Sequence, residues 1–237
     1  MTDETENRRP LKVRAAKWPR ALAARLAKAQ ISPDTISMGS VAFAVLGGAL
    51  LMLAGGVGPG LRTAALIGAA LCIQLRLVCN LLDGLVAVEH GKGTPAGPIW
   101  NELPDRVADV LFLVGAGYGA RTAGMHGAEA LGWMAGVLAV TTAYVRELGR
   151  GLGQPADFSG PMAKPQRMAA LTIACGLSLL EPLWGGGGQV MVAALAVIVI
   201  GTLVTVVRRT RRLAMRLSDG ADRQPDAPPP GELSRSD

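Results

Sequence analysis

The distribution of apolar residues constrains this chain more than any other feature of its sequence. These residues come in long blocks, whereas the charged residues collect between the blocks and at both ends of the 237-residue chain. A soluble globular chain would interleave the two kinds of residue with the period of a helix or a strand. Blocks of about 20 apolar residues are instead what a membrane-spanning helix requires. The pattern therefore predicts an all-α, polytopic membrane protein.

Six membrane-spanning helices can be placed on these blocks, at about residues 35–56, 62–88, 99–120, 128–149, 167–184 and 188–208. Glycine and alanine fill the blocks, which favours helices that pack closely through small residues. Three regions follow: a basic juxtamembrane segment at 1–30, a six-helix membrane domain at 31–212 and a polar tail at 213–237. The tail contains consecutive prolines and is predicted to be disordered.

Lysine and arginine are distributed unevenly between the two sides of the predicted bundle. Only Arg62 and Arg121 lie on one side, whereas the other side receives both basic termini and the loops after the second and fourth helices. Because cytoplasmic segments carry the excess of positive charge, both termini are predicted to be cytoplasmic in a multi-pass protein of the cell (inner) membrane. The charges flank spanning segments, so anionic membrane lipids are the expected partner and nucleic acid is not.

The segment before the first spanning helix mixes apolar and basic side chains. Residues 11–29 include Trp18 and Leu22 among several cations, and they predict an amphipathic juxtamembrane helix on the membrane surface. Pro19 interrupts this segment, so one helix and two short helices are both compatible with it.

The second predicted helix ends in a polar stripe. One helical face carries residues spaced i, i+3, i+4 and i+7, namely Asn80, Asp83, Gly84 and Ala87. Ionisable side chains inside a membrane are costly, and their default interpretation is a functional one. The two small residues would let a bulky ligand approach the backbone of this helix.

The third predicted helix carries a similar stripe. Its members are spaced by four residues and are Gly97, Asn101, Asp105 and Asp109. Two such stripes facing each other would form an oxygen-rich pocket beside the cytoplasmic face. Mg²⁺ prefers oxygen ligands, usually carboxylates together with substrate phosphates. Clustered carboxylates repel one another without a cation, so a metal site is predicted.

The combined spacing resembles the signature of the CDP-alcohol phosphatidyltransferase family, Asp-x2-Asp-Gly-x2-Ala-Arg-x8-Gly-x3-Asp-x3-Asp. Every spacing is met. The matching residues are Asp83, Gly84, Ala87, Gly97 and Asp105, and the departures are Asn80, Val88 and Asn101. Residues 31–37 are similar to the opening of the family's first helix, and residues 160–168 resemble its short basic segment before the fifth helix.

This resemblance implies an enzyme of phospholipid biosynthesis, which transfers a phosphatidyl group from CDP-diacylglycerol to an alcohol acceptor and releases CMP. It implies Mg²⁺ or Mn²⁺ as the cofactor and Asp105 as the catalytic base. The implied metal ligands are Asn80, Asp83, Asn101 and Asp105, and the implied substrate-binding residues are Gly84, Ala87, Gly97, Lys164 and Arg167.

Other functions and assemblies stay open at this point. The same pocket could transfer a CDP-linked headgroup to diacylglycerol, or the chain could be a catalytically degenerate membrane protein that binds a lipid or a nucleotide. Family members often form homodimers, which this sequence neither supports nor excludes.

The two asparagines lower the negative charge of the motif, and three interpretations follow. In the favoured one, Asp109, one turn after Asp105, restores the missing charge of a variant active site as a metal ligand, alone or together with Glu102 or Glu89. In the second, the register shifts so that Asp105 and Asp109 are the pair of the third helix. In the third, catalysis is lost and only binding remains. The first interpretation predicts that Asp109→Ala abolishes activity.

The acceptor alcohol is not identified by any of these residues. A phosphorylated acceptor would need its own pocket of cations, for which the candidates are Arg146, Arg150, Lys164 and Arg167. A neutral or zwitterionic acceptor would not need them.

Overall fold

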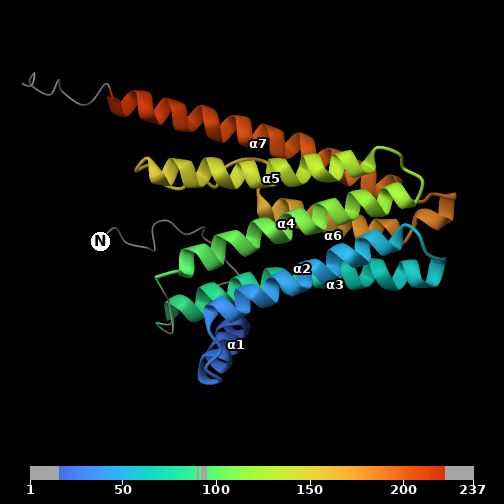
Figure 1. Cartoon of the computed structure of the whole chain (residues 1–237), viewed down its shortest axis with the longest axis horizontal. Helices are drawn as coiled ribbons and strands as arrows, with labels where there is room; N and C mark the ends of the chain where they lie inside the picture. Colours follow the sequence, from blue (N-terminus) through green and yellow to red (C-terminus); the bar gives the residue numbers. More distant parts are fainter. Residues whose placement is uncertain (1–15, 90, 92–94, 222–237) are drawn as a thin grey trace, which may run out of the picture.

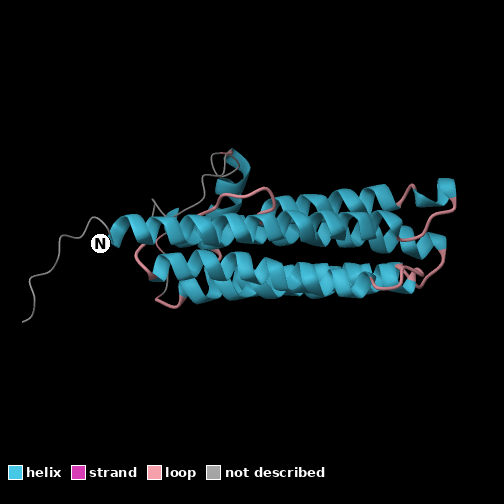
Figure 2. Ribbon diagram, turned by 90° about the horizontal axis from the view of Figure 1, so that it is seen from above, coloured by secondary structure: helices cyan, strands magenta, loops and turns pink. Residues whose placement is uncertain are grey.

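The computed structural model of the chain describes residues 16–89, 91 and 95–221. Within these ranges it contains helices and no strand, so the all-α prediction is confirmed (Figure 1, Figure 2). The helices are α1 (Lys17–Lys28), α2 (Pro33–Ala54), α3 (Pro59–Glu89), α4 (Gly97–Thr122), α5 (Ala128–Gly151), α6 (Lys164–Ser178), the 3₁₀ turn η2 (Glu181–Trp184) and α7 (Gln189–Ala221).

Helices α2 to α7 form at the six places where the apolar blocks lie, but they are not equally apolar. Helices α2, α3 and α5 and the range Gln189–Asp219 of α7 are long and apolar enough to cross a membrane. Helix α4 is less apolar than these helices because it carries a polar stripe. Helix α6 ends at Ser178 and is therefore shorter than the predicted segment 167–184. The chain then continues in η2, which contains a proline near its start.

Helix α7 is longer than the sixth predicted segment. It continues to Ala221, so the prediction of disorder from residue 213 is wrong for the stretch that the helix covers. The first five residues of this stretch, Leu-Ala-Met-Arg-Leu at 213–217, all have high helix propensity. The rest of the predicted tail, and residues 1–15 of the predicted basic segment, lie outside the described residues.

The long helices run side by side along one axis, and α1 lies across the bundle near one end (Figure 1). Helix α1 is a single helix in which Pro19 falls within the first turn, where a missing N–H costs little. Its buried residues Ala23 and Ala27 pack on a cluster that includes Leu82 and Val86 near the end of α3. This packing ties α1 to the end of the bundle where the polar stripe of α3 lies.

Helix α2 packs along both α3 and α4, whereas α3 and α4 contact each other little. Glycines allow α2 and α4 to approach closely. A Cβ atom built on Gly115 would lie 2.5 Å from the carbonyl oxygen of Gly48, and one built on Gly119 would lie 2.0 Å from that of Leu51. Small residues in register are a usual means of such backbone contact between membrane helices. The result is a gap between α3 and α4 that side chains must bridge.

We expect Gly115→Ala to destabilise the protein by about 1–3 kcal/mol, because the added methyl group overpacks the contact of α2 with α4. Gly39→Ala is the matched control, since a Cβ atom on Gly39 would meet no atom within 4 Å. Alanine is the better helix former by about 0.5–1 kcal/mol, so the control should be neutral or stabilising. Thermal unfolding in detergent checks both variants, and equal stability of the two would contradict the close contact.

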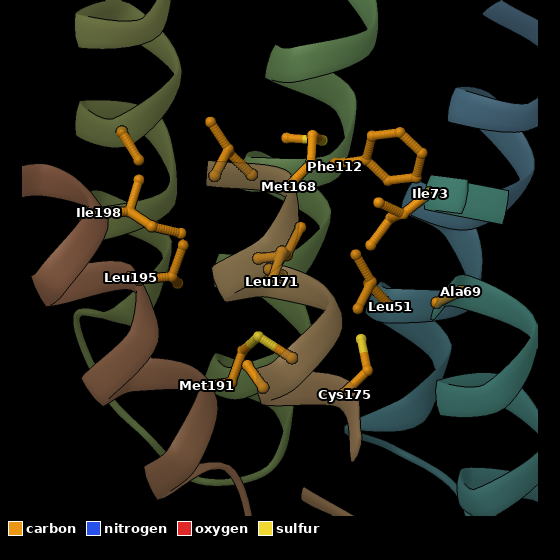
Figure 3. Close-up of a cluster of buried hydrophobic side chains, with 14 of the residues drawn as sticks. Leu51, Ala69, Ile73, Phe112, Met168, Leu171, Cys175, Met191, Leu195 and Ile198 are labelled. Atoms are coloured by element: carbon orange, nitrogen blue, oxygen red, sulfur yellow. The ribbon is translucent and has the colours of Figure 1, made fainter. Parts of the chain in front are cut away.

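A cluster of buried apolar side chains fills the middle of the bundle (Figure 3). Ile73 on α3, Phe112 on α4 and Met168 on α6 are completely buried. Each lies within about one helical turn of a charged residue on the same helix, namely Arg76, Asp109 and Arg167. These apolar side chains therefore form a water-excluding floor beneath a group of charged residues.

Candidate functional site

Charged and amide side chains from α3, α4 and α6 meet directly above this apolar floor. We call them the polar cluster: Arg76, Asn80, Asp83, Asp105, Asp109, Lys164 and Arg167. Residue 76 lies four positions before residue 80, so the stripe of α3 continues one turn deeper into the bundle than its motif. The cluster thus connects α3 and α4, which otherwise contact each other little because both pack on α2.

Asp105 is the centre of the polar cluster. Its carboxylate accepts hydrogen bonds from the side-chain amide of Asn80 and from the ammonium group of Lys164. The guanidinium group of Arg76 lies 3.2 Å from Oδ1 of Asp105 and also donates to its backbone carbonyl at 3.0 Å. Asp105 therefore connects three helices and remains 8% exposed.

Asp83 is held from the side of α2. The hydroxyl group of Ser37 donates to Oδ2 of Asp83 at 2.7 Å, and both side chains are buried. Ser37 is positioned by the start of α2, where the side chain of Ser32 caps the helix by accepting from the amide of Thr35. Asp83 also interacts electrostatically with Asp105. The role of the 31–37 segment is thus to begin a helix that orients one of the carboxylates.

Asp109 is enclosed by two arginines. Its Oδ1 lies 3.1 Å from Arg76 and its Oδ2 lies 2.7 Å from Arg167. All three side chains are at most 1% exposed. Both carboxylate oxygens of Asp109 are therefore used by protein cations, and its predicted role as a metal ligand stays a prediction.

The segment that precedes α6 delivers two cations to the polar cluster. Gly160 has a φ of +124°, and a Cβ atom there would collide with Thr205 of α7. The amide of Met162 donates to Oγ1 of Thr205 at 3.0 Å, and the Met162 carbonyl accepts from Arg167 at 3.1 Å. These contacts position Lys164 and Arg167, the two substrate-binding candidates of this segment, beside the carboxylates.

The other predicted residues line the approach to the polar cluster. Gly84 and Ala87 are half-buried on the same face of α3, and a Cβ atom on Gly84 would meet nothing within 4 Å. Asn101 is exposed and Gly97 half-exposed, one and two turns from Asp105 toward the start of α4. The structure thus brings Asn80 into contact with Asp105 but does not bury Asn101 with them.

A second group of charges lies beside the polar cluster, between α5, α7 and the loop before α6. We call it the basic recess; it is lined by Val145, Arg146, Gly149, Pro155, Asp157, Arg209, Leu213 and Arg216. Arg146 pairs with Glu102 of α4 and lies over the ring of Phe158 at 5.5 Å. This cation–π contact and ion pair fix the guanidinium group at the edge of the recess.

Hydrogen bonds and arginines together favour the charged form of Asp157 in the loop of the basic recess. Burial raises the pKa of Asp157, but hydrogen bonding with Ser159 and the charges of Arg209 and Arg212 prevail and hold it below its ordinary value. Arg209 donates to the backbone carbonyls of Ser159 and Thr142, each at 2.9 Å, which joins the loop to α5. Three arginines and one aspartate therefore line the recess, and Arg209 fixes the loop against α5.

Sequence reasoning missed Ser37, Arg76 and Arg209 as site residues. Extending the i, i+4 stripe of α3 back by one turn would have found Arg76. Ser37 and Arg209 carry no comparable signal, because their partners lie 46 and 50 or more residues away in the chain. Within the described residues, no group of three or more histidine, cysteine, aspartate or glutamate side chains is arranged as a metal site.

The described structure is an all-helical bundle with polar stripes on α3 and α4 and a basic segment before α6, which is the arrangement that the motif predicted. No family model matches the chain. It is, however, 28% identical over 219 residues to the phosphatidylinositol phosphate synthase of Mycobacteroides abscessus, covering 87% of each chain. It is also 28% identical over 226 residues to that of Mycolicibacterium smegmatis, covering 89% of this chain and 90% of the relative.

Solved structures agree with this relationship. Mycobacterium tuberculosis phosphatidylinositol phosphate synthase in complex with manganese and citrate matches with a TM-score of 0.68 at 17% identity, over 83% of this chain and 88% of that one. The same protein with CDP-DAG bound matches with a TM-score of 0.68 at 18% identity, over 84% and 94%. These matches show the fold, and with the sequence relatives they confirm the predicted relationship to the CDP-alcohol phosphatidyltransferases.

A further relative is matched over a shorter stretch. The bifunctional IPC transferase and DIPP synthase of Rubrobacter xylanophilus is 33% identical over 149 residues, which are 60% of this chain and 30% of that protein.

Proposed function

We propose that this protein transfers the phosphatidyl group of CDP-diacylglycerol to a phosphorylated alcohol of the inositol phosphate type and releases CMP. The observation that carries the proposal is the polar cluster, in which Asp83 of α3 and Asp105 of α4 meet above a dry apolar floor. The phosphatidylinositol phosphate synthases that resemble the chain over most of its length support the choice of donor and acceptor.

The residues of the polar cluster fit a divalent cation. Asp83 and Asp105 contribute carboxylate oxygens from two helices, and Asn80 and Asn101 add amide oxygens on the same stripes. Mg²⁺ and Mn²⁺ favour such oxygen donors, and the manganese complex of the structural neighbour supports this choice. When bound, a divalent cation would neutralise the pyrophosphate of the donor and stabilise the leaving phosphate.

The remaining steps, proton transfer and substrate binding, are assigned to residues of the protein. Asp105, at the centre of the cluster and 8% exposed, accepts the proton of the attacking hydroxyl group. Lys164, whose side chain is 21% exposed, can exchange its contact with Asp105 for a substrate phosphate. Gly84 and Ala87 leave space for the nucleotide beside α3. The apolar floor excludes water, which would otherwise compete with the acceptor.

The function is tested by CMP release from CDP-diacylglycerol by the purified protein with Mn²⁺, using inositol phosphate, inositol and glycerol phosphate as acceptors. We expect release with inositol phosphate that chelation of the metal stops. A parallel reaction with a CDP-linked headgroup as donor and diacylglycerol as acceptor tests the reverse assembly. Release only in that parallel reaction would replace the proposed donor, and release in neither would favour a binding protein.

Arg146, at the edge of the basic recess, is the candidate for contact with a phosphorylated acceptor. We expect Arg146→Ala to raise the KM for inositol phosphate by about 10-fold to 100-fold, since a hydrogen bond to a charged group contributes about 1.5–3 kcal/mol. The KM for CDP-diacylglycerol should change little. Arg150→Ala is the matched control, one turn away on α5, because Arg150 is exposed and pairs with Glu147 at 3.0 Å. Equal effects of the two variants on the acceptor KM would argue against the recess.

The membrane arrangement forms part of the same proposal. Helices α4 and α6 complete a six-span bundle, because the polar face of α4 points inward to the cluster and large apolar side chains such as Leu103 and Ile173 are exposed. Helix α1 lies on the membrane surface with Trp18, which is 52% exposed. Both termini are cytoplasmic, as the arginine and lysine distribution indicates. The homodimer expected from the family stays a prediction.

A further inference from the structure

Building on the proposed phosphatidyl transfer, we propose that this site binds a single divalent cation. The guanidinium group of Arg76 supplies the positive charge that a second divalent cation would otherwise provide. The inference concerns the number of metal ions, which the lowered negative charge of the motif does not fix by itself. It depends on how the charges of the polar cluster are paired in three dimensions.

The carboxylates that remain for metal binding are Asp83 and Asp105. Asp109 does not add to them, because its two oxygens are engaged by Arg76 and Arg167 at 3.1 and 2.7 Å. Asn80 is neutral and already donates its amide group to Asp105. The two negative charges of these carboxylates neutralise one divalent cation. The charge of a second divalent cation would not be neutralised.

Arg76 cannot leave the site. Its side chain is 0% exposed, and it lies between Asp105 at 3.2 Å and Asp109 at 3.1 Å. A guanidinium group keeps its charge at all accessible pH values. A second divalent cation on Asp105 would therefore lie close to a permanent positive charge in a water-poor environment, where repulsion is strong.

Lys164 differs from Arg76 in this respect. Its ammonium group also contacts Asp105, but its side chain is 21% exposed and flexible, so it can move to a substrate phosphate when a metal ion binds. Arg76, in contrast, retains Nε and Nη1 without a hydrogen-bond partner in the part of the chain that the structure describes. Its charge is therefore only partly balanced by hydrogen-bond acceptors, and it can act at short range on a phosphate bound at Asp105, as the charge of a second metal ion would.

The test is the number of Mn²⁺ ions bound per chain by the purified protein in detergent, measured from the loss of the free Mn²⁺ signal in electron paramagnetic resonance. We expect one ion per chain in the unmodified protein and at least a tenfold weaker affinity in Asp83→Asn. We expect Asn80→Asp alone to bind one ion and Asn80→Asp combined with Arg76→Met to bind two, because only the double variant removes the buried charge. The count for the unmodified protein does not depend on whether a variant folds.

The outcomes separate this inference from the proposed function. Two ions per chain in the unmodified protein would overturn the inference and leave phosphatidyl transfer standing. One ion per chain without CMP release would support the count and overturn the transferase. A second ion in Asn80→Asp alone would show that Arg76 does not exclude it. No bound Mn²⁺, with CMP release that persists after chelation, would overturn both the inference and the metal dependence.

Discussion

Asp105→Asn is expected to reduce CMP release by about 10²- to 10⁴-fold at saturating Mn²⁺, the range lost when a general base is removed. Asparagine has nearly the same shape as aspartate but cannot accept the proton of the acceptor hydroxyl. It also removes half of the carboxylate charge that Asp83 and Asp105 offer to a metal ion. Rate measurements with saturating inositol phosphate separate this loss from weaker acceptor binding.

Glu129→Gln is the matched control for this substitution. It makes the same chemical change on α5, at the far end of the bundle, where Glu129 lies 3.5 Å from Arg121. Both variants should unfold at temperatures close to that of the unmodified protein, because Arg76 keeps Asp109 as a partner when Asp105 is neutralised. If Asp105→Asn kept a rate within threefold of the unmodified enzyme, Asp105 would not be the base.

The second large effect concerns Asp109. We expect Asp109→Ala to lower the free energy of unfolding by about 3–5 kcal/mol, because it leaves Arg76 and Arg167 buried without their carboxylate partner. Activity should be lost together with stability, since Arg76 also contacts Asp105. Unfolding of the purified protein in detergent, followed by circular dichroism, measures the change.

A compensating substitution distinguishes the two possible roles of Asp109. Asp109→Ala combined with Arg167→Met should recover part of the lost stability, because one buried charge is removed with its partner. A metal-ligand role predicts a different pattern. In that case Asp109→Ala would keep normal stability but bind Mn²⁺ more weakly, and the interpretation first drawn from the sequence would be the correct one.

Much of the fold and the core of the site could be predicted from the sequence. The apolar blocks predicted helices α2 to α7, because burying a helix in lipid depends on local composition. The i, i+3, i+4 spacing of Asn80 and Asp83 predicted their common face, which follows from the helical period alone. The four-residue spacing on the next predicted helix placed Asp105 on a stripe that was expected to face them, and the family motif agreed with it. Each of these inferences uses residues within one or two neighbouring helices.

The pairing of charges was decided only by the tertiary structure. Asp109 and Arg167 are 58 residues apart, and Ser37 and Asp83 are 46 apart, so no local period reports either contact. Arg76 lies outside the motif on α3, yet the packing of the helices places its guanidinium group beside both Asp105 and Asp109 of α4. The sequence alone determined which helices form and which faces are polar, through local hydrophobicity and helical period. Which carboxylates remain for a metal ion depends on the packing of α2, α4 and α6, because a buried charge is neutralised by whatever lies beside it in space.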